Sequence, residues 1–450
     1  MQTKRTYYPL TKSQRTVLPP LFFPRHEDVF VRMLFSVAEE CDVGALEKAF
    51  LHLVETQDAL RLRLHFGWRG LSQYVTDAEP LSVPVVALRD ESELDAAVQE
   101  RYGMLKNPLF GGALYRAVIF TYDGHASLFV IFSHLCFDGY SFALTYKLLK
   151  EYYLAYANGE EPKDLPKRYS YTDYCKEDMR YNASERKAED LAYWRALFRQ
   201  KPYMSGFLPP FSLRAVYSPF KTQNRTIKGE LRTAVIEFCR SCGVSVPYFL
   251  TATAALTAKY LTGKEKIMFV GQSHGRSTVL QKRLIGMMVD AFPIIFDLSD
   301  AQTLTDYYTS GYLSYLEDVK HSKASIYRAI LGDWKLWIKQ RYFPTCSEVF
   351  SGTLGFSMMG DDPQFPFRFV LPHYFFAQFY LLFFDDYIDG AFVSASYQSL
   401  RYSEERISQL LETYCAIAAS VVSRPEQTVA ELVRSVAESG KIDEAIGQRR

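Results

Sequence analysis

One stretch of the chain decides the fold: Ile131-Phe-Ser-His-Leu-Cys-Phe-Asp-Gly-Tyr-Ser141. It reads as an apolar strand that ends at His134, followed four residues later by an Asp-Gly turn at Asp138 and Gly139. Glycine permits a backbone turn that residues with a Cβ resist, and Ser141 is a residue type that caps helices. Because the end of a buried strand holds a side chain rigidly, the pattern favours a functional imidazole at His134 over a packed core histidine.

The residues on both sides of this stretch predict a mixed α/β lobe. Apolar residues alternate with polar ones where strands are expected and recur every three to four residues where helices are expected. Asp123-Gly124 is typical of a tight hairpin turn. The predicted elements are strand 30–37, a helix capped by Asp42 and running to Val54, strand 59–66, strands 114–120 and 126–132, and a helix from about Ser141.

After a polar linker at 157–167 the pattern of helices and strands begins again. The predicted elements there are helices 184–197, 231–242 and 247–262, strand 266–271, strands 376–385 and 390–398 around Tyr387-Ile-Asp-Gly390, and a closing helix 403–422. Two halves with a similar order of elements predict two α+β lobes.

The overall composition excludes several classes of protein. With 52 Lys+Arg against 51 Asp+Glu, the net charge of +1 gives no footprint for nucleic acid. No apolar run is long enough for a membrane span, and no apolar segment follows the basic residues of the N-terminus, so we expect neither a membrane span nor a secretory signal. The 7 cysteines are sparse, which is typical of reduced thiols in a cytoplasmic protein. Cys239 and Cys242 form a single CxxC without a second pair or a nearby histidine, so we expect no metal site.

Several motifs, in shared order and spacing, give the chain a family resemblance. Ser133-His134-Leu-Cys-Phe-Asp138-Gly139 matches the signature H-H-x-x-x-D-G except at its first position. On these residues the chain resembles the condensation domains of nonribosomal peptide synthetases, within the chloramphenicol acetyltransferase-like acyltransferases. The other matching segments are Tyr8-Pro-Leu-Thr-x-x-Gln14, Leu53 to Arg61, Tyr171-Thr-Asp-Tyr174, Tyr193-Trp194, Gly275-Arg276, Ile285-Gly286-x-x-Val289, Gly390 to Tyr397, and Tyr402 onward.

The resemblance implies a fold and a set of partners. It implies two acetyltransferase-like lobes, 1–170 and 171–450, in a V-shaped pseudo-dimer with the active site in a tunnel between them. The acyl donor would arrive on the phosphopantetheine of a separate carrier protein, because the chain has no adenylation signature and no carrier-protein serine motif. The acceptor would be an amine or alcohol, free or carrier-bound. No bound cofactor is expected, and the chain is expected to be a monomer.

The resemblance also assigns roles to residues. His134 would act as general base, or position the nucleophile, or stabilise the tetrahedral intermediate. The backbone N–H of Gly139 is a candidate donor to the oxyanion. Asp138 would be structural, paired with Arg276. No Ser/His/Asp nucleophile arrangement is evident, so no covalent acyl-enzyme is expected.

Two positions depart from the family pattern. Ser133 replaces the first histidine and cannot transfer a proton at pH 7, although the second histidine carries most of the catalysis in the family. Asp290 stands where the family has asparagine, and it would either recognise a cationic acceptor or be solvated at the rim. Ser133 and Asp290 are therefore the candidate substrate-binding residues.

Two other functions compete with the condensation enzyme. A coenzyme-A-dependent O-acyltransferase of the same superfamily would carry D-F-G-W-G, and Gly355-Phe-Ser-Met-Met-Gly360 differs from that motif. A non-catalytic scaffold that recruits a carrier or an enzyme is supported by Ser133. The presence together of His134, Asp138, Gly139 and Arg276 argues against the scaffold.

Overall fold

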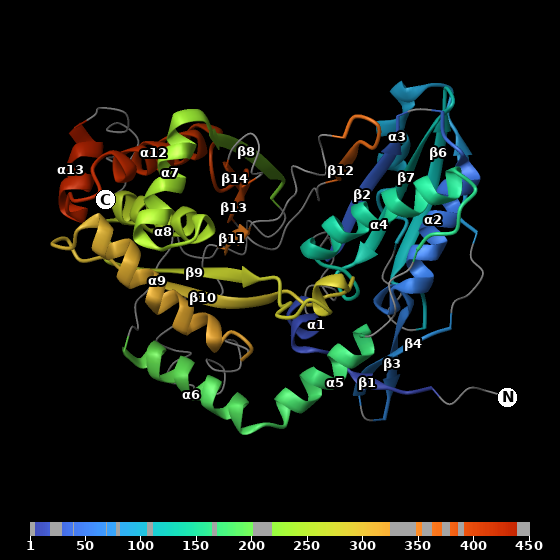
Figure 1. The fold of residues 1–450 in the computed structure, drawn as a ribbon, viewed down its shortest axis with the longest axis horizontal. Coiled ribbons are helices and arrows are strands. Elements are labelled where there is room, and N and C mark those ends of the chain that lie inside the picture. The colour runs from blue at the N-terminus through green and yellow to red at the C-terminus, as the bar shows by residue number, and fades with distance from the viewer. Residues whose placement is uncertain are drawn as a thin grey trace. The chain divides into compact units, whose positions relative to one another are not determined.

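The computed structural model describes residues 5–18, 29–38, 40–68, 70–77, 82–105, 111–163, 169–200, 218–324, 348–352, 362–370, 379–385 and 391–438. They belong to two compact units, which are described separately (Figure 1). The first comprises Met1–Ser184, His274–Val289 and Phe356–Pro372, and the second Glu185–Ser273, Asp290–Gly355 and His373–Arg450. The lobe limits 1–170 and 171–450 stay a prediction. The units differ from these limits by residues 171–184 and by two segments that return to the first unit.

The first unit holds two sheets with helices. Its elements are β1 (Tyr8–Pro9), α1 (Lys12–Val17), β2 (Phe30–Val37), α2 (Val43–Thr56), the 3-10 turn η2 (Asp58–Arg61), β3 (Leu62–Gly67), β4 (Gly70–Val75), β5 (Val85–Ala87), η3 (Glu91–Glu93), α3 (Leu94–Arg101), β6 (Tyr115–Tyr122), β7 (His125–Ser133), α4 (Gly139–Ala157), α5 (Tyr171–Asn182), η5 (Gln281–Arg283) and β12 (Phe367–Phe369).

The larger sheet, in the order β12-β2-β7-β6-β5, is covered on both faces. Alternate residues of β7 point to opposite faces, as the strand geometry requires. Val130 and Phe132 join a core made with α2 and α4, whereas Phe129 and Ile131 join a smaller core with α3. Strand β7 is therefore buried along its length, and its end is a rigid place for a functional residue.

Several sequence predictions for this unit are confirmed. Strand β2 has the predicted bounds, and the Asp42 side chain caps α2 by accepting a hydrogen bond from Ala45 N. The β6–β7 hairpin turns at Asp123 (φ 47°) and Gly124 (φ 81°). Both residues have positive φ, which is the type I′ geometry that matches strand twist.

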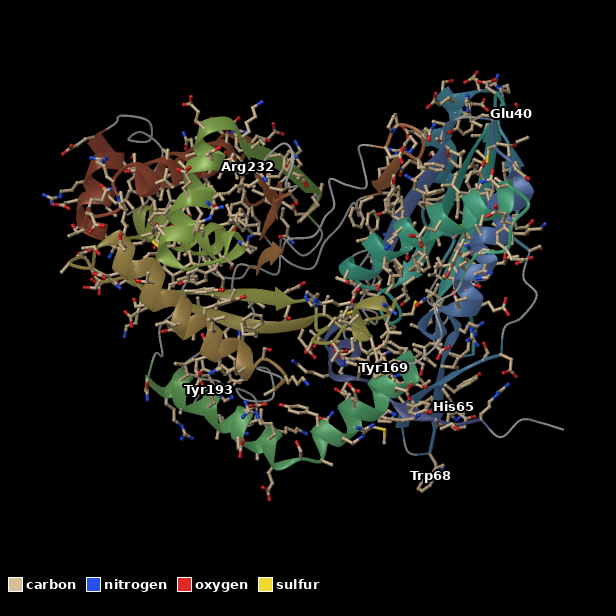
Figure 2. All side chains as sticks on the ribbon, in the orientation of Figure 1. Glu40, His65, Trp68, Tyr169, Tyr193 and Arg232 are labelled. Carbon is tan, nitrogen blue, oxygen red and sulfur yellow. The ribbon has the colours of Figure 1, made fainter. Side chains whose placement is uncertain are left out.

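The predicted strand 59–66 is wrong in part. Residues Asp58–Arg61 form a 3-10 turn, and β3 begins only at Leu62. The expected alternation fails because Arg63 is buried while His65 and Phe66 are exposed. His65 and Trp68 lie toward the outer end of the β3–β4 hairpin (Figure 2).

The second unit holds a mixed sheet in the order β10-β9-β11-β13-β14-β8. Its elements are α6 (Glu185–Gln200), β8 (Phe220–Ile227), α7 (Gly229–Cys242), α8 (Val246–Thr262), β9 (Lys266–Ser273), β10 (Asp290–Asp297), α9 (Leu304–Lys320), β11 (Glu348–Gly352), β13 (Phe379–Asp385), β14 (Ala391–Gln398), α12 (Glu404–Ser423) and α13 (Val429–Glu438). The stretch Tyr387 to Gly390 lies outside the described residues.

Helix α8 forms the centre of this unit's core. Its residues from Tyr248 to Lys259 are all buried, and the helix is packed against strands of the sheet and against α12. Ser245 caps its start and Gly263, with φ 67°, ends it. A helix buried on every side needs partners for its polar side chains, and the hydroxyls of Thr251, Thr253 and Thr257 donate to carbonyl oxygens of the helix itself.

Within the described residues, no helix is long and apolar enough to cross a membrane. The same residues contain no group of three or more His, Cys, Asp or Glu side chains that could hold a metal. Cys239 and Cys242 both lie on α7, where Cys239 is buried in the core of the second unit.

Candidate functional site

The loop between β7 and α4 carries His134 and is fixed by its backbone. His134 N donates to Val29 O at 2.7 Å, and Ser133 N donates to Leu114 O at 2.7 Å. The ring of Phe137 stacks on Phe132 with centroids 4.1 Å apart and planes 2° from parallel. The loop is thus anchored to neighbouring backbone and, through one stacked pair, to the core.

The hydrogen bond of the His134 ring determines which nitrogen carries the proton. Nδ1 lies 2.8 Å from the carbonyl oxygen of Phe137. A carbonyl oxygen can only accept, so Nδ1 carries the proton and Nε2 keeps its lone pair. Burial lowers the pKa of His134 from its ordinary value, against the Asp138 charge and the bond to Phe137, which act to raise it. The imidazole is therefore neutral at pH 7 with Nε2 able to take a proton.

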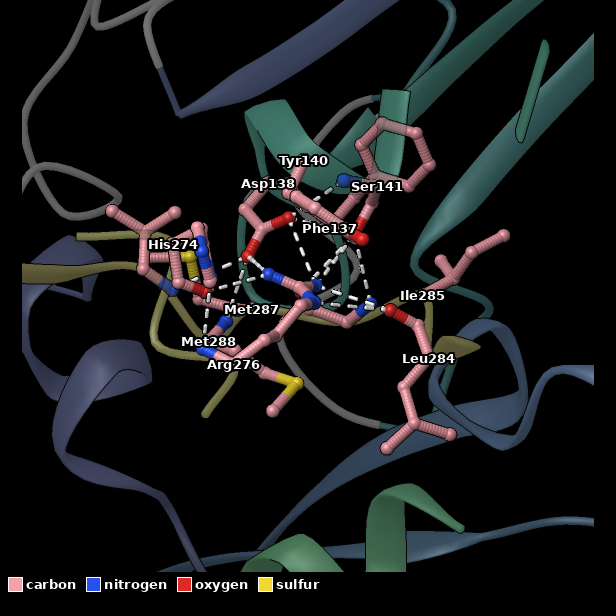
Figure 3. A network of polar contacts seen from close by, with 12 residues as sticks. Phe137, Asp138, Tyr140, Ser141, His274, Arg276, Leu284, Ile285, Met287 and Met288 are labelled. Atoms are coloured by element: carbon pink, nitrogen blue, oxygen red, sulfur yellow. Dashed lines mark hydrogen bonds and ion pairs between the residues drawn. The ribbon is translucent and has the colours of Figure 1, made fainter. Parts of the chain in front are cut away.

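The carboxylate of Asp138 is the centre of a buried network (Figure 3). Its Oδ1 accepts from Ser141 N at 2.8 Å and from Ser141 Oγ at 2.7 Å. Its Oδ2 accepts from Met288 N at 2.9 Å and from Val289 N at 3.2 Å. The residue that caps α4 is therefore Asp138, and the prediction of Ser141 as cap is wrong, because the carboxylate accepts from the Ser141 N–H within the first helical turn.

Arg276 meets this carboxylate with two parallel bonds, so the predicted ion pair is confirmed. Nη1 lies 2.9 Å from Asp138 Oδ2 and Nη2 lies 3.2 Å from Oδ1, and both side chains are fully buried. The guanidinium also donates to the carbonyl oxygens of His274, Leu284 and Gly286. Burial acts to raise the pKa of Asp138, but the Arg276 charge and the donated hydrogen bonds outweigh it and hold that pKa below its ordinary value.

Two glycines of the site differ in what they require. Gly275 has φ 65°, and a Cβ there would lie 1.8 Å from Met288 O, so only glycine fits. Gly139 lies outside the left-handed region, and a Cβ there would meet no atom within 4 Å. The prediction that Gly139 serves a special turn is therefore wrong, because it takes helical backbone as the first residue of α4. At that position its N–H has no partner within the helix and points out from the helix start.

Ser133 is buried, and its hydroxyl is used inside the loop. Leu135 N donates to Ser133 Oγ at 3.3 Å, and Cys136 N donates to Ser133 O at 3.0 Å. Ser133 therefore hydrogen-bonds within the loop at the strand end, and its contact with substrate stays a prediction.

Sequence reasoning quoted Gln14 but gave it no role in the site. Its side chain is fully buried, and Nε2 donates to Leu135 O at 2.8 Å and to Gln73 Oε1 at 2.7 Å. Thr11 N donates back to Gln14 Oε1 at 2.9 Å. Gln14 therefore ties α1 to the loop one residue after His134. The signal for it was its place in the opening motif Tyr8-Pro-Leu-Thr-x-x-Gln14, which resembles that of the family.

The first unit brings together His134, Asp138, Gly139, Arg276 and Ser133. Asp290 is the first residue of β10 in the second unit, where it pairs with Ser273 of β9. Its role as a substrate-binding residue stays a prediction. The segment Gly355 to Gly360 lies outside the described residues.

Comparisons with known proteins identify the family to which the chain is similar. Residues 4–332 match the family described as Condensation domain. Surfactin synthase subunit 1 of Bacillus subtilis (strain 168) is 22% identical over 444 residues, which cover 95% of this chain and 12% of that protein. The chain thus spans about an eighth of the length of this curated relative.

Two solved structures share the fold over nearly the whole chain. The first condensation domain of the calcium-dependent antibiotic synthetase, in complex with a substrate analogue, superposes with a TM-score of 0.74 at 17% identity, covering 95% of this chain and 98% of that one. The X-domain from teicoplanin biosynthesis has a TM-score of 0.77 at 16% identity, covering 96% and 98%.

Proposed function

The chain belongs to the condensation-domain family, and we propose that it transfers an acyl group from a carrier-bound phosphopantetheine thioester to an amine or alcohol. Condensation domains of this type are generally acyltransferases. The observation that carries the proposal for this chain is the ring of His134. Its Nδ1–H is held by Phe137 O, which leaves a neutral imidazole with Nε2 free to accept a proton.

The proposed reaction needs one proton acceptor and one oxyanion donor. The acceptor's nitrogen or oxygen attacks the thioester carbonyl while Nε2 of His134 takes the proton that this atom loses. The N–H of Gly139 donates to the oxygen that gains negative charge. The carbon–sulfur bond then breaks, and the imidazolium returns its proton to the leaving thiolate. An amide or ester and a free carrier thiol result.

Asp138 and Arg276 support this reaction without touching substrate. Their ion pair holds the start of α4, and with it Gly139, against the segment from His274 to Val289. Both side chains are fully buried, which leaves them no room to contact a reactant.

The test is product formation from defined substrates. The purified chain is incubated with an acyl-loaded carrier protein and a panel of amines and alcohols, and products are identified by mass spectrometry. His134→Ala should lower single-turnover transfer by about 100-fold or more, because general acid–base catalysis contributes about 10²–10⁴-fold. His65→Ala is the matched control, since His65 is an exposed histidine of the same unit. It should transfer at the wild-type rate.

The outcomes separate the three candidate functions. An His134→Ala variant that keeps more than about a third of the rate excludes His134 as general base. Transfer from acyl-coenzyme A but from no carrier supports the O-acyltransferase. A wild-type chain that binds loaded carrier yet forms no product supports the scaffold.

A further inference from the structure

His274 lies beside the network around Asp138, and neither the family signature nor the proposed mechanism uses it. It follows β9 and belongs with Gly275 and Arg276 to the segment that returns to the first unit. Figure 3 shows its ring at the edge of the network, next to the Asp138 carboxylate. The ring centroid lies 5.4 Å from that of Tyr140, the second residue of α4.

The ring of His274 is held in one tautomer. Its Nδ1 lies 3.0 Å from the backbone nitrogen of Arg276, which can only donate. Nδ1 is therefore the acceptor, and the proton of the neutral ring sits on Nε2. Partial burial, together with the charges of Arg276 and Lys282, holds the pKa of His274 below its ordinary value, while one side of the ring stays exposed. The side chain therefore presents a neutral N–H donor.

This orientation is the reverse of the one at His134. There Nδ1 donates to a carbonyl and Nε2 is the acceptor, whereas at His274 Nδ1 accepts and Nε2 is the donor. Both rings lie close enough to Asp138 to feel its charge. The two imidazoles near this carboxylate thus have complementary functions. His134 can accept a proton at Nε2, and His274 can donate a hydrogen bond from Nε2–H to an oxygen.

The positive charges near the ring favour an electron-rich oxygen as the partner of Nε2–H. Tyr140 is fixed because its hydroxyl donates to Lys282 O at 3.1 Å and its ring covers Arg276, whose Cζ lies 4.4 Å from the ring centre. Lys282 is exposed and adds a positive charge near the ring. His274 itself is also exposed, so a reactant can reach it.

We propose that His274 is a substrate-binding residue whose Nε2–H donates a hydrogen bond to an oxygen of the acyl substrate. This inference rests on the proposed function. The oxygen belongs either to the thioester carbonyl, which becomes the oxyanion, or to the phosphate of the pantetheine arm. Both are oxygen acceptors that gain from a neutral donor, and the positive charges of Arg276 and Lys282 act on the ring more strongly than the negative charge of Asp138.

Two substitutions separate this role from bracing of the loop. His274→Asn keeps an acceptor for the Arg276 N–H, because asparagine side chains accept from the backbone two residues on, but it loses the donor at the Nε2 position. His274→Gln places an amide N–H near the former Nε2 and gives up the Nδ1 position. We expect His274→Asn to lower kcat/KM about 10-fold, which corresponds to the loss of about one hydrogen bond. His274→Gln should lower kcat/KM at most about 3-fold.

The kinetic constants identify the oxygen. With acyl-loaded carrier, a loss confined to kcat assigns Nε2–H to the thioester carbonyl, because that interaction strengthens in the transition state. A loss confined to KM assigns it to the phosphate. The phosphate assignment also requires that His274→Asn turn over acyl-pantetheine lacking the 4′-phosphate as well as wild type does.

The ranking of the two variants decides the inference. If His274→Asn transfers as well as wild type, or if His274→Gln is equally or more impaired, His274 only braces the loop and the inference is overturned. A wild-type chain without transferase activity defeats the proposed function instead. An inactive chain forms no oxyanion, so only a hydrogen bond to the bound ligand remains to be tested there. Calorimetric binding of hexanoyl-4′-phosphopantetheine and hexanoyl-pantetheine then ranks the same variants, and binding of both ligands that is unchanged by His274→Asn overturns the inference.

Discussion

Removing either partner of the Asp138–Arg276 pair should lower the free energy of unfolding by about 3–5 kcal/mol, because it leaves an uncompensated buried charge. Asp138→Ala should cost more than Arg276→Ala. After Arg276→Ala the carboxylate still accepts from Ser141, Met288 and Val289. After Asp138→Ala the helix also loses its cap, which is worth about 0.5–2 kcal/mol.

A double-mutant cycle measures the coupling between the two residues. The double variant has no unpaired charge at this place, so its loss should fall short of the sum of the single losses by at least about 2 kcal/mol. The assay is urea unfolding followed by circular dichroism, with hydrogen exchange of residues 274–289 as a local readout. Lys176→Ala is the control, because its ion pair with Asp173 is solvent-exposed and should contribute about 0–1 kcal/mol. Losses that add within about 0.5 kcal/mol would refute the reasoning.

Three further predictions concern the same network. The pKa of Asp138 is depressed in the folded chain, so its ionised carboxylate stabilises the fold above the unfolded pKa near 4. That stabilisation is lost as the pH falls through the folded pKa. The free energy of unfolding, measured from pH 6 to pH 2, should therefore fall less steeply for Asp138→Asn than for wild type. Gly275→Ala should lower the melting temperature or prevent folding, since its Cβ would overlap Met288 O. Gly139→Ala should leave the melting temperature within a few degrees of wild type, because a Cβ there meets no atom. Equal losses of melting temperature in the two variants would contradict the geometry. Gln14→Leu should lower the transfer rate about 3- to 10-fold and the stability by about 1–3 kcal/mol, because Leu135 O and the Gln73 amide lose their partner; an unchanged rate would show that the loop does not need this tie.

The sequence predicted well where local pattern and tertiary packing agree. Strand β2 has the predicted bounds because its run of β-forming residues is buried on both faces of the sheet. Helix α2 has the predicted position because it has one apolar face and Asp42 caps it. The histidine loop was recognised because strand, turn and helix start follow within a few residues. The pairing of Arg276 with Asp138 came from family resemblance, since no local pattern links residues so far apart.

Elements that depend on distant neighbours were missed. Strand β8 reads Phe-Lys-Thr-Gln-Asn-Arg-Thr-Ile and lacks an apolar run, yet it forms the edge of the second unit's sheet by pairing with β14. Strand β12 has only Phe367–Phe369 and exists because β2 supplies its partner. In β3 the expected alternation of buried apolar and exposed polar residues failed, because Arg63 is buried and Phe66 is exposed. Which side chains of β3 are buried depends on its place in the small sheet with β4 and β1, not on their hydrophobicity. The tautomers of His134 and His274 could not be foreseen either, because each is set by a backbone group that only the fold brings near.

The return of residues 274–289 to the first unit has a consequence for biosynthesis. A ribosome releases Asp138 long before Arg276, which follows it by 138 residues. Until then the carboxylate can cap α4 through Ser141, but its contacts with the later segment have no partner. The nascent first unit must therefore keep this carboxylate hydrated or protonated, and the candidate site is completed late, after residues 185–273 of the second unit have been synthesised. A long loop must close before the buried pair contributes anything, so completion of the site is expected to be a slow step of folding.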